Sequence, residues 1–241
     1  SRLNALLRET EFDSRDALLR CLRDRSRSSL RDRLVQNTLV NETFFFRDTH
    51  PFNALRDDIL PELIESRRAE RSLAIWCAAC ATGQEPYSVS MLIADHFPSI
   101  SGWKVWIRGS DYSESSIEQA REGIYSGIET SRGLTDDQRQ RHFERTGDDE
   151  FQVNGRIRER TDFFRHNLSR PWPADGQKDL VMLRNVLIYF DEESRAQILD
   201  RIGRSLRCGG YLVLGTTESL PAGGDVFEQM QYGRTICYRK K

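Results

Sequence analysis

From Ser72 onward, apolar runs alternate with amphipathic stretches, and this alternation predicts a parallel sheet wrapped by helices. Apolar runs predict strands over residues 73–79, 105–111, 180–183 and 210–215, and a last strand over 235–239 that closes the sheet at an edge. Helical spacing predicts helices over residues 86–97, 113–123 and 192–208. The pattern therefore predicts an α/β fold with a doubly wound, mostly parallel sheet.

Before the predicted sheet, residues 1 to 40 show the spacing of short helices, and the aromatic segment 41–48 predicts a buried junction. Residues 52–68 predict a further helix that Pro61 weakens in its middle. Its inward side chains are Leu55, Ile59, Leu60 and Leu63. We therefore expect an N-terminal helical domain with its junction over residues 1–48 and a second domain over 49–241.

One segment predicts a departure from the α/β pattern. Residues 151–160 alternate around Asn154 and Gly155, a dipeptide typical of a tight hairpin turn. This pattern predicts a small antiparallel β insertion at about residues 147–166.

Composition excludes several classes of protein. The 36 Lys and Arg against 37 Asp and Glu give a net charge of -1, whereas proteins that grip nucleic acid carry a strong basic excess. No apolar run reaches the roughly 18 to 20 residues that cross a bilayer, and the first segment is too charged for a signal peptide. Five cysteines, an odd number, argue against a disulfide framework. We expect a cytoplasmic protein.

The basic residues are locally concentrated near the start of the chain. Residues 14–33 hold seven Arg against three Asp, and helical spacing places most of the Arg side chains outside the apolar stripe. This face is either merely solvated or complementary to an acidic partner.

A binding site is predicted where the strand over 73–79 meets the following helix. Small residues and Gly83 allow a tight turn beyond the carboxyl end of a strand, where ligands bind in open α/β sheets. The turn is not G-x-G-x-x-G, and Glu85 stands where a pyrophosphate needs helix N-terminal amides. The carboxylate instead suits a ligand with a positive charge or with hydroxyl or amine donors.

Other polar residues follow the next strands. Asp111 can accept hydrogen bonds from the two hydroxyls of an adenosine ribose, and it can also cap the helix that begins near Ser113. Arg184 and Asn185 end a central strand, which favours the cleft over the core. Tyr189 either faces that cleft or is an ordinary half-buried core tyrosine.

The sequence shows no strong signal for a metal site or for a catalytic nucleophile. A single Cys77-x-x-Cys80 without a second pair is better explained as small residues packing a turn, and the four histidines show no ligand spacing. No G-x-S-x-G elbow is present. We expect no bound metal.

Taken together, these segments resemble the chemotaxis receptor methyltransferases, protein-glutamate O-methyltransferases that use S-adenosylmethionine. The resemblance spans residues 41–219 and rests on ordered blocks: Asn41-x-Thr43-x-Phe45-Phe46-Arg47, Trp76 to Ser88 ending in GQEPYS, Ser110-Asp111, Asn167-Leu168 before Trp172-Pro173, Arg184 to Phe190, and a Gly-Gly strand followed by Glu218-Ser219. Gln84 departs from the family's usual GEEPYS, while Glu85 is kept.

The resemblance implies a Rossmann-like class I methyltransferase fold and a site for S-adenosylmethionine and its product S-adenosylhomocysteine. By matching, it implies these cofactor-binding residues: Asn41, Thr43, Arg47, Glu85, Asp111, Asn167, Leu168, Arg184 and Asn185. Arg47 is expected to position the substrate carboxylate and Tyr189 to form a wall of the methyl pocket, and these are the two candidate catalytic residues.

The resemblance also implies a partner, the cytoplasmic helical bundle of a chemoreceptor, without direct membrane insertion or nucleic acid. Arg20, Arg23 and Arg27 are then expected to bind this acidic substrate. Two alternatives stay open: a module that senses S-adenosylmethionine or its product without turnover, and a methyltransferase of nucleic acid or a small molecule. The second often needs an Asn/Asp-Pro-Pro-aromatic strand end, where this chain has Arg184-Asn185-Val186-Leu187.

Overall fold

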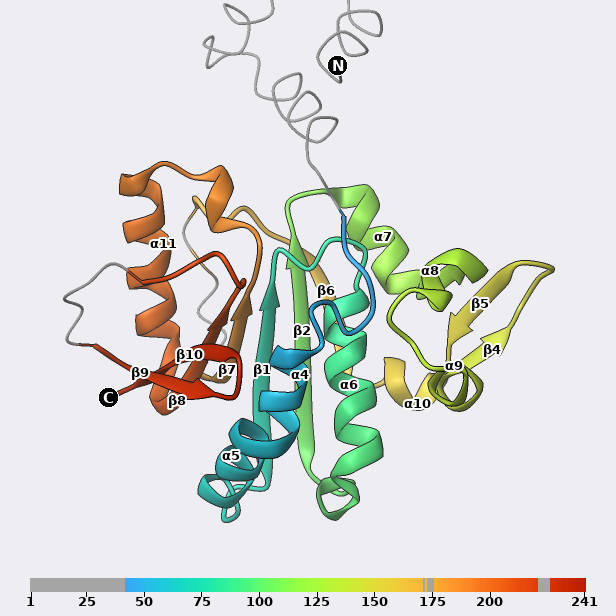
Figure 1. Ribbon diagram of the computed structural model, residues 1–241, viewed down its shortest axis with the longest axis horizontal. Coiled ribbons are helices and arrows are strands. Elements are labelled where there is room, and N and C mark those ends of the chain that lie inside the picture. Colours follow the sequence, from blue (N-terminus) through green and yellow to red (C-terminus); the bar gives the residue numbers. More distant parts are fainter. Residues whose placement is uncertain (1–41, 171, 173–175, 221–225) are drawn as a thin grey trace, which may run out of the picture. The chain divides into compact units, whose positions relative to one another are not determined.

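The computed structural model describes residues 42–170, 172, 176–220 and 226–241. A seven-stranded sheet with the order β6-β2-β1-β7-β8-β10-β9 forms its centre (Figure 1), and β10 pairs antiparallel with both β8 and β9 while the other neighbours pair parallel. The strands are β1 (Ser72–Ala78), β2 (Lys104–Asp111), β6 (Thr161–Arg165), β7 (Lys178–Leu183), β8 (Leu206–Leu214), β9 (Phe227–Tyr232) and β10 (Thr235–Lys240). The predicted α/β class with a mostly parallel sheet is confirmed.

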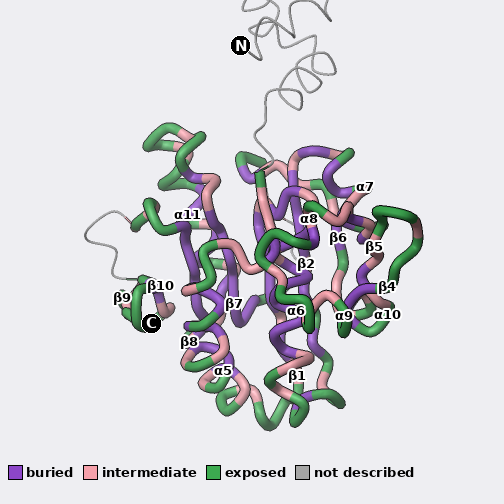
Figure 2. The backbone as a smooth tube through the Cα atoms, turned by 45° about the vertical axis from the view of Figure 1, so that its right-hand side comes forward, coloured by how far each residue is buried: buried purple, intermediate pink, exposed green. Residues whose placement is uncertain are grey.

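The central strands are apolar on both faces because helices cover both. In β1, Ile75 and Cys77 belong to one hydrophobic cluster, whereas Trp76 and Ala78 belong to a second cluster. The first cluster includes α6 (Gln84–His96), and the second includes α11 (Glu192–Ser205). Figure 2 shows the resulting band of buried backbone through the sheet. Successive side chains of a strand point to opposite faces, so the uninterrupted apolar runs reflect burial on both sides.

The remaining described helices are short. They are α4 (His50–Ala54), a π-helical turn (Leu55–Ile59), α5 (Leu60–Ser66), a 3-10 turn (Pro98–Ile100), α7 (Glu114–Glu122), α8 (Gly127–Ser131), α9 (Asp136–His142), α10 (Gly155–Arg158) and a 3-10 turn (Leu187–Tyr189). The predicted helix over 52–68 is confirmed, and its four inward side chains are buried. Pro61 is accommodated because the π-helical turn ends at Ile59, so that Pro61 lies in the first turn of α5.

The predicted hairpin at Asn154 is wrong. Asn154 instead caps α10, where its Oδ1 accepts from the Ile157 amide at 3.1 Å. Asn suits a helix N-cap as well as a turn, and the buried Ile157 favours the helix.

The antiparallel insertion itself exists, with different bounds from those predicted. Its sheet has the order β3-β5-β4, formed by β3 (Ile124–Ser126), β4 (Phe143–Arg145) and β5 (Glu150–Val153). Its tight connection is residues 146–149, where the Thr146 amide donates to the Glu150 carbonyl at 2.9 Å. Residues 161–165, expected in the insertion, form β6 of the main sheet.

The C-terminal predictions need two corrections. The helix expected to reach Cys208 ends at Ser205, because β8 already begins at Leu206. The strand expected at the sheet edge, β10, lies between β8 and the edge strand β9. Sequence patterns missed β9 because Glu228, Gln229 and Gln231 interrupt its apolar positions and every side chain is exposed or half-buried, as is usual at an edge.

The compact unit that holds the sheet begins at Thr43, so residues 43–48 pack with the sheet. The helices expected over residues 1–40 lie outside the described residues. Within the described part of the chain, no helix combines the length and apolar character that a membrane crossing requires.

Candidate active site

The carboxyl ends of three parallel strands meet at one edge of the sheet. Ala78 at the end of β1 is in register with Ser110 of β2 and with Leu183 of β7. The segments that follow, 79–85, 111–113 and 184–185, therefore start side by side. The three groups of candidate residues that sequence places after these strands share one site.

The turn between β1 and α6 is strained and closely packed. Ala79 and Ala81 have φ of 57° and 49°, conformations that L residues seldom adopt outside functional loops. Gly83, with φ of 96°, is the left-handed N-cap of α6. A Cβ at Gly83 would lie 2.8 Å from the Ala120 Cβ, so no larger residue fits. The turn brings its backbone close to the sheet edge, as a ligand-binding loop requires.

The cysteines of this turn belong to its packing, as predicted. Cys77 and Cys80 are free and buried, and burial raises the pKa of both thiols well above the ordinary value. A buried neutral thiol behaves as a small apolar side chain. In the ranges that the structure describes, no group of three or more His, Cys, Asp or Glu side chains is placed to hold a metal ion.

Asp111 holds two loops together. Its Oδ2 accepts from the Ala81 amide and its Oδ1 from the Ser113 amide, both at 2.9 Å. The N-cap of α7 is Ser113, whose hydroxyl accepts from the Ser116 amide, so the alternative in which Asp111 caps this helix is wrong. Burial raises the pKa of Asp111, and the backbone hydrogen bonds oppose that rise. The Tyr112 amide is a third backbone donor to this carboxylate, so one of its four lone-pair sites stays available for a ligand hydroxyl.

Glu85 and Arg184 form a buried ion pair beside this turn. Arg184 Nη1 donates to Glu85 Oε2 at 2.9 Å, and the side chains are 2% and 12% exposed. Arg184 Nη2 also donates to Asp48 Oδ2 at 2.7 Å and to the Arg47 carbonyl at 2.9 Å. Burial raises the pKa of Glu85, while the charge of Arg184 opposes that rise. Glu85 and Asp48 thus share the Arg184 guanidinium, and the charge of Arg47 also acts on Glu85.

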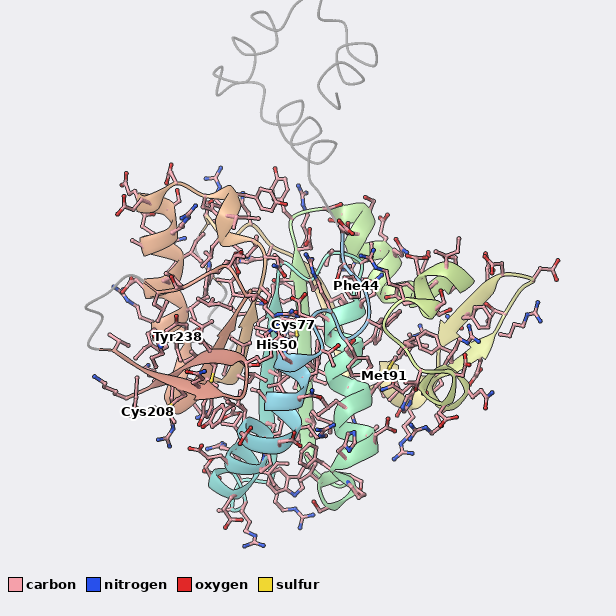
Figure 3. All side chains as sticks on the ribbon, in the orientation of Figure 1. Phe44, His50, Cys77, Met91, Cys208 and Tyr238 are labelled. Carbon is pink, nitrogen blue, oxygen red and sulfur yellow. The ribbon has the colours of Figure 1, made fainter. Side chains whose placement is uncertain are left out.

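The segment from Thr43 to His50 is anchored against the sheet by aromatic packing. Phe45 is fully buried, with its ring centroid 5.1 Å from that of Tyr125 and 5.4 Å from that of Phe143. The Phe46 amide donates to Ser88 Oγ of α6 at 2.9 Å. His50, labelled in Figure 3, shares a hydrogen bond with Thr235 Oγ1 at 2.8 Å. The predicted buried junction is therefore confirmed at Phe45.

Within this segment, the ring of Phe44 contacts two guanidinium groups. Arg47 Cζ lies 5.8 Å from the Phe44 ring centroid and Arg132 Cζ lies 4.1 Å from it. The Arg47 carbonyl contacts Arg184, and the Arg47 charge helps to lower the pKa of Glu85. The backbone of Arg47 therefore contacts the guanidinium that pairs with Glu85, at the same edge of the sheet.

The loop after β7 is held by a carboxylate that sequence reasoning did not single out for a role. Asn185 has φ of 58°, and its amide donates to Glu218 Oε2 at 2.7 Å. The same carboxylate accepts from the amides of Leu187 and Gly215. Asn167 Oδ1 accepts from the Ser169 amide, and Leu168 is buried against the α11 face. Tyr189 is 58% exposed, so the alternative of a core tyrosine is wrong.

The structure brings most predicted site residues to one edge of the sheet. Strand ends and hydrogen bonds bring together Arg47, Glu85, Asp111, Asn167, Leu168, Arg184 and Asn185. Thr43 is half-buried and Tyr189 is 58% exposed, and their roles stay predictions. Asn41, Arg20, Arg23 and Arg27 lie outside the described residues. Asp48 and Glu218 were missed as contributors, although each lies within or beside a block of the resemblance. Their contacts join segments about 30 to more than 130 residues apart, which no local pattern reveals.

Comparisons with known proteins agree with this geometry. The family described as "CheR methyltransferase, SAM binding domain" matches residues 41–236. A Pseudomonas aeruginosa protein named "Chemotaxis protein methyltransferase 1" is 39% identical over 244 residues, covering 100% of this chain and 88% of that protein. A Vibrio parahaemolyticus "Chemotaxis protein methyltransferase" is 36% identical over 248 residues, covering 100% and 87%.

Solved structures of similar fold are much more distant in sequence. The glycopeptide N-methyltransferase MtfA in complex with S-adenosylmethionine is 16% identical, with a TM-score of 0.39 over 75% of this chain and 66% of that chain. A likeness at this level carries no argument about function.

Proposed function

This chain belongs to the CheR methyltransferase family, and from that premise we propose that it transfers a methyl group from S-adenosylmethionine to glutamate carboxylates on the cytoplasmic helices of a chemoreceptor. The product is a glutamate methyl ester, formed during adaptation of a chemosensory pathway in the cytoplasm. The observation that carries the proposal is the pair of buried carboxylates, Glu85 and Asp111, beside the strained turn at the ends of β1 and β2.

These residues fit the proposed cofactor chemically. In the proposal, Glu85 pairs with the methionine ammonium group and Asp111 accepts a hydrogen bond from the ribose hydroxyls. Asn167 and Leu168 line the adenine side, and Thr43, Asn41, Arg47, Arg184 and Asn185 complete the pocket. Arg184 Nε is buried without a hydrogen-bond partner among the described residues, as is consistent with a polar ligand atom nearby.

The reaction needs little acid–base chemistry from the protein. S-adenosylmethionine supplies an electrophilic methyl group, and a glutamate with an ordinary pKa of about 4.3 is already ionised at pH 7. A carboxylate oxygen forms the new bond to the methyl carbon while the bond from carbon to sulfur breaks and its electron pair stays on sulfur. No proton is transferred, so the protein contributes orientation and the exclusion of water.

Two residues are proposed to act directly at the reacting atoms. Arg47 orients the substrate carboxylate, and its proximity to Glu85 keeps it from becoming so strong a partner that it quenches the nucleophile. Tyr189 forms a wall of the methyl pocket, consistent with its exposure on the 3-10 turn after the site loop. An Arg47→Ala variant that transfers methyl at the wild-type rate would refute the first role.

The receptor is proposed to dock on the N-terminal segment of the chain through Arg20, Arg23 and Arg27. Opposite charges on the two partners would speed their encounter and make it salt-sensitive. Reversing Arg23 and Arg27 to Glu should lower receptor methylation and flatten its dependence on ionic strength. If both quantities stay at wild-type values, this face is merely solvated.

The experiment that tests the function is transfer of labelled methyl to a purified chemoreceptor cytoplasmic fragment, followed by alkali treatment that releases the label as methanol. Asp111→Asn should abolish most alkali-labile label, whereas Asp162→Asn, whose side chain is 50% exposed on β6, is the matched control. If S-adenosylhomocysteine binds but no receptor accepts label, the module that senses the cofactor without turnover becomes the better explanation.

A further inference from the structure

The carboxylate of Glu218 accepts hydrogen bonds from three backbone amides that belong to two loops. Its Oε2 accepts from the amides of Asn185 at 2.7 Å and Gly215 at 2.9 Å, and its Oε1 accepts from the amide of Leu187 at 2.7 Å. Glu218 lies on the loop that follows β8, whereas Asn185 and Leu187 follow β7. Hydrogen bonds to an ionised carboxylate are shorter and stronger than neutral ones. This carboxylate therefore ties the two loops firmly together.

The loop after β7 needs such support because its backbone is unfavourable on its own. Asn185 has φ of 58°, a conformation that persists where surrounding contacts hold it. Directly beyond it the chain turns into the 3-10 segment that presents Tyr189 to solvent. We call the Glu218 carboxylate and the three amides that donate to it, those of Asn185, Leu187 and Gly215, the clamp. The clamp fixes the path of the chain from Asn185, on the cofactor side of the proposed pocket, to Tyr189, at the proposed methyl pocket.

The clamp also explains why a glycine follows β8. A Cβ on Gly215 would lie 2.6 Å from Glu218 Oε2 and 2.8 Å from the Asn185 nitrogen. Gly215 is absent from the residues with positive φ, so space and not backbone freedom requires glycine at this position. Any side chain there would wedge the carboxylate away from the amide that it accepts from.

We propose that Glu218 is a positioning residue for methyl transfer, which holds Asn185 and Tyr189 in the geometry that the cofactor and the reacting methyl need. The proposal rests on the proposed function for the roles of Asn185 and Tyr189. Glu218 itself touches neither cofactor nor substrate in this view, because its oxygens are directed to backbone amides. It acts through the loop whose shape it sets.

The isosteric variant Glu218→Gln tests the clamp with little change in volume. Its NH2 group must face either the Leu187 amide or the pair from Asn185 and Gly215, so donor meets donor on one side. We expect the Kd for S-adenosylhomocysteine to rise about tenfold or more and kcat to fall about tenfold to a hundredfold, from the loss of charged hydrogen bonds to the loop after β7. Glu228→Gln, an exposed carboxylate on β9, is the matched control.

Gly215→Ala disturbs the hydrogen bond between the Gly215 amide and the Glu218 carboxylate by changing the residue that donates it. It should reproduce the weaker binding of S-adenosylhomocysteine, and the double variant with Glu218→Gln should lose less than the product of the two separate effects. Gly203→Ala in α11 is the control, because its Cβ would meet only ordinary contacts of 3.5 Å or more. Should Glu218→Gln fail to fold, Gly215→Ala carries the test alone.

The measurements are calorimetric titration with S-adenosylhomocysteine and methyl-transfer kinetics, both well below the melting temperature of each variant. A purely structural Glu218 would lower the melting temperature but leave Kd and kcat of the folded protein at wild-type values, and that result overturns the proposal. If wild-type protein binds S-adenosylhomocysteine but methylates no receptor fragment, the proposed substrate fails, while the binding titrations still decide the role of Glu218.

Discussion

Removing the guanidinium of Arg184 should cost far more stability than removing an exposed guanidinium with a similar partner. Arg184 is 2% exposed and pairs with Glu85 at 2.9 Å, whereas Arg204 is 79% exposed and pairs with Asp200 at the same distance. The variants Arg184→Met and Arg204→Met therefore delete guanidinium groups that differ in burial, and Arg184→Met also removes the hydrogen bonds to Asp48 and to the Arg47 carbonyl.

The magnitudes follow from desolvation. Deleting one partner of a buried pair leaves the other charge uncompensated, and Arg184→Met should cost about 3 to 5 kcal/mol of unfolding free energy at pH 7. Arg204→Met should cost about 0.5 kcal/mol or less. In a domain of about 200 residues, where 1 kcal/mol shifts the melting temperature by roughly 2 to 4 °C, the first loss is about 6 to 20 °C.

The loss at Arg184 should also depend on pH. Burial already raises the folded-state pKa of Glu85, so the folded protein binds this proton more tightly than the unfolded chain does. The resulting stabilisation is present below the unfolded pKa of about 4.3 and is lost as pH rises through the folded pKa. Without Arg184 the folded pKa rises further, so the gap between variant and wild type should narrow as pH falls from 7 towards 5.

Urea unfolding followed by circular dichroism at pH 7 and pH 5 measures both effects. The reasoning is refuted if Arg184→Met and Arg204→Met differ by less than about 1 kcal/mol at pH 7, because the predicted costs are well separated. A gap between Arg184→Met and wild type that is the same at both pH values would show that Glu85 is not the charge left behind.

Three further variants test other features of the described structure. Gly133→Ala should destabilise by about 2 kcal/mol or more, since its φ is 90° and a Cβ would lie 1.8 Å from the Phe45 carbonyl oxygen, whereas Gly155→Ala, with open space around it, should be neutral in urea unfolding. Phe45→Ala should cost about 3 to 5 kcal/mol because the ring is fully buried, and a loss below about 1.5 kcal/mol would contradict that packing. Tyr189→Ala should leave the unfolding free energy within about 0.5 kcal/mol of wild type but slow methyl transfer; unchanged kinetics would remove Tyr189 from the pocket.

Local sequence determined the main elements of this protein. The cores of β1 and β7 are recognisable because residues 73–79 and 180–183 are apolar at every position, whichever face of the sheet each side chain meets. Glu85, Asp111 and Arg184 lie at or after the ends of predicted strands. Because parallel strands end at the same edge of the sheet, the sequence predicts that these three residues share one site. The ordered blocks added the family and, through it, the expected cofactor.

Only the tertiary structure decided what depends on contacts between distant segments. The dipeptide Asn154-Gly155 is compatible with two local structures, a tight turn or a capped helix. The burial of Ile157 in the folded protein favours the helix. The edge strand β9 carries no apolar pattern because only one neighbour pairs with it. Asp48 accepts a hydrogen bond from the Arg184 guanidinium, and Glu218 accepts hydrogen bonds from three backbone amides. These contacts depend on positions in space that the spacing of residues along the sequence does not encode.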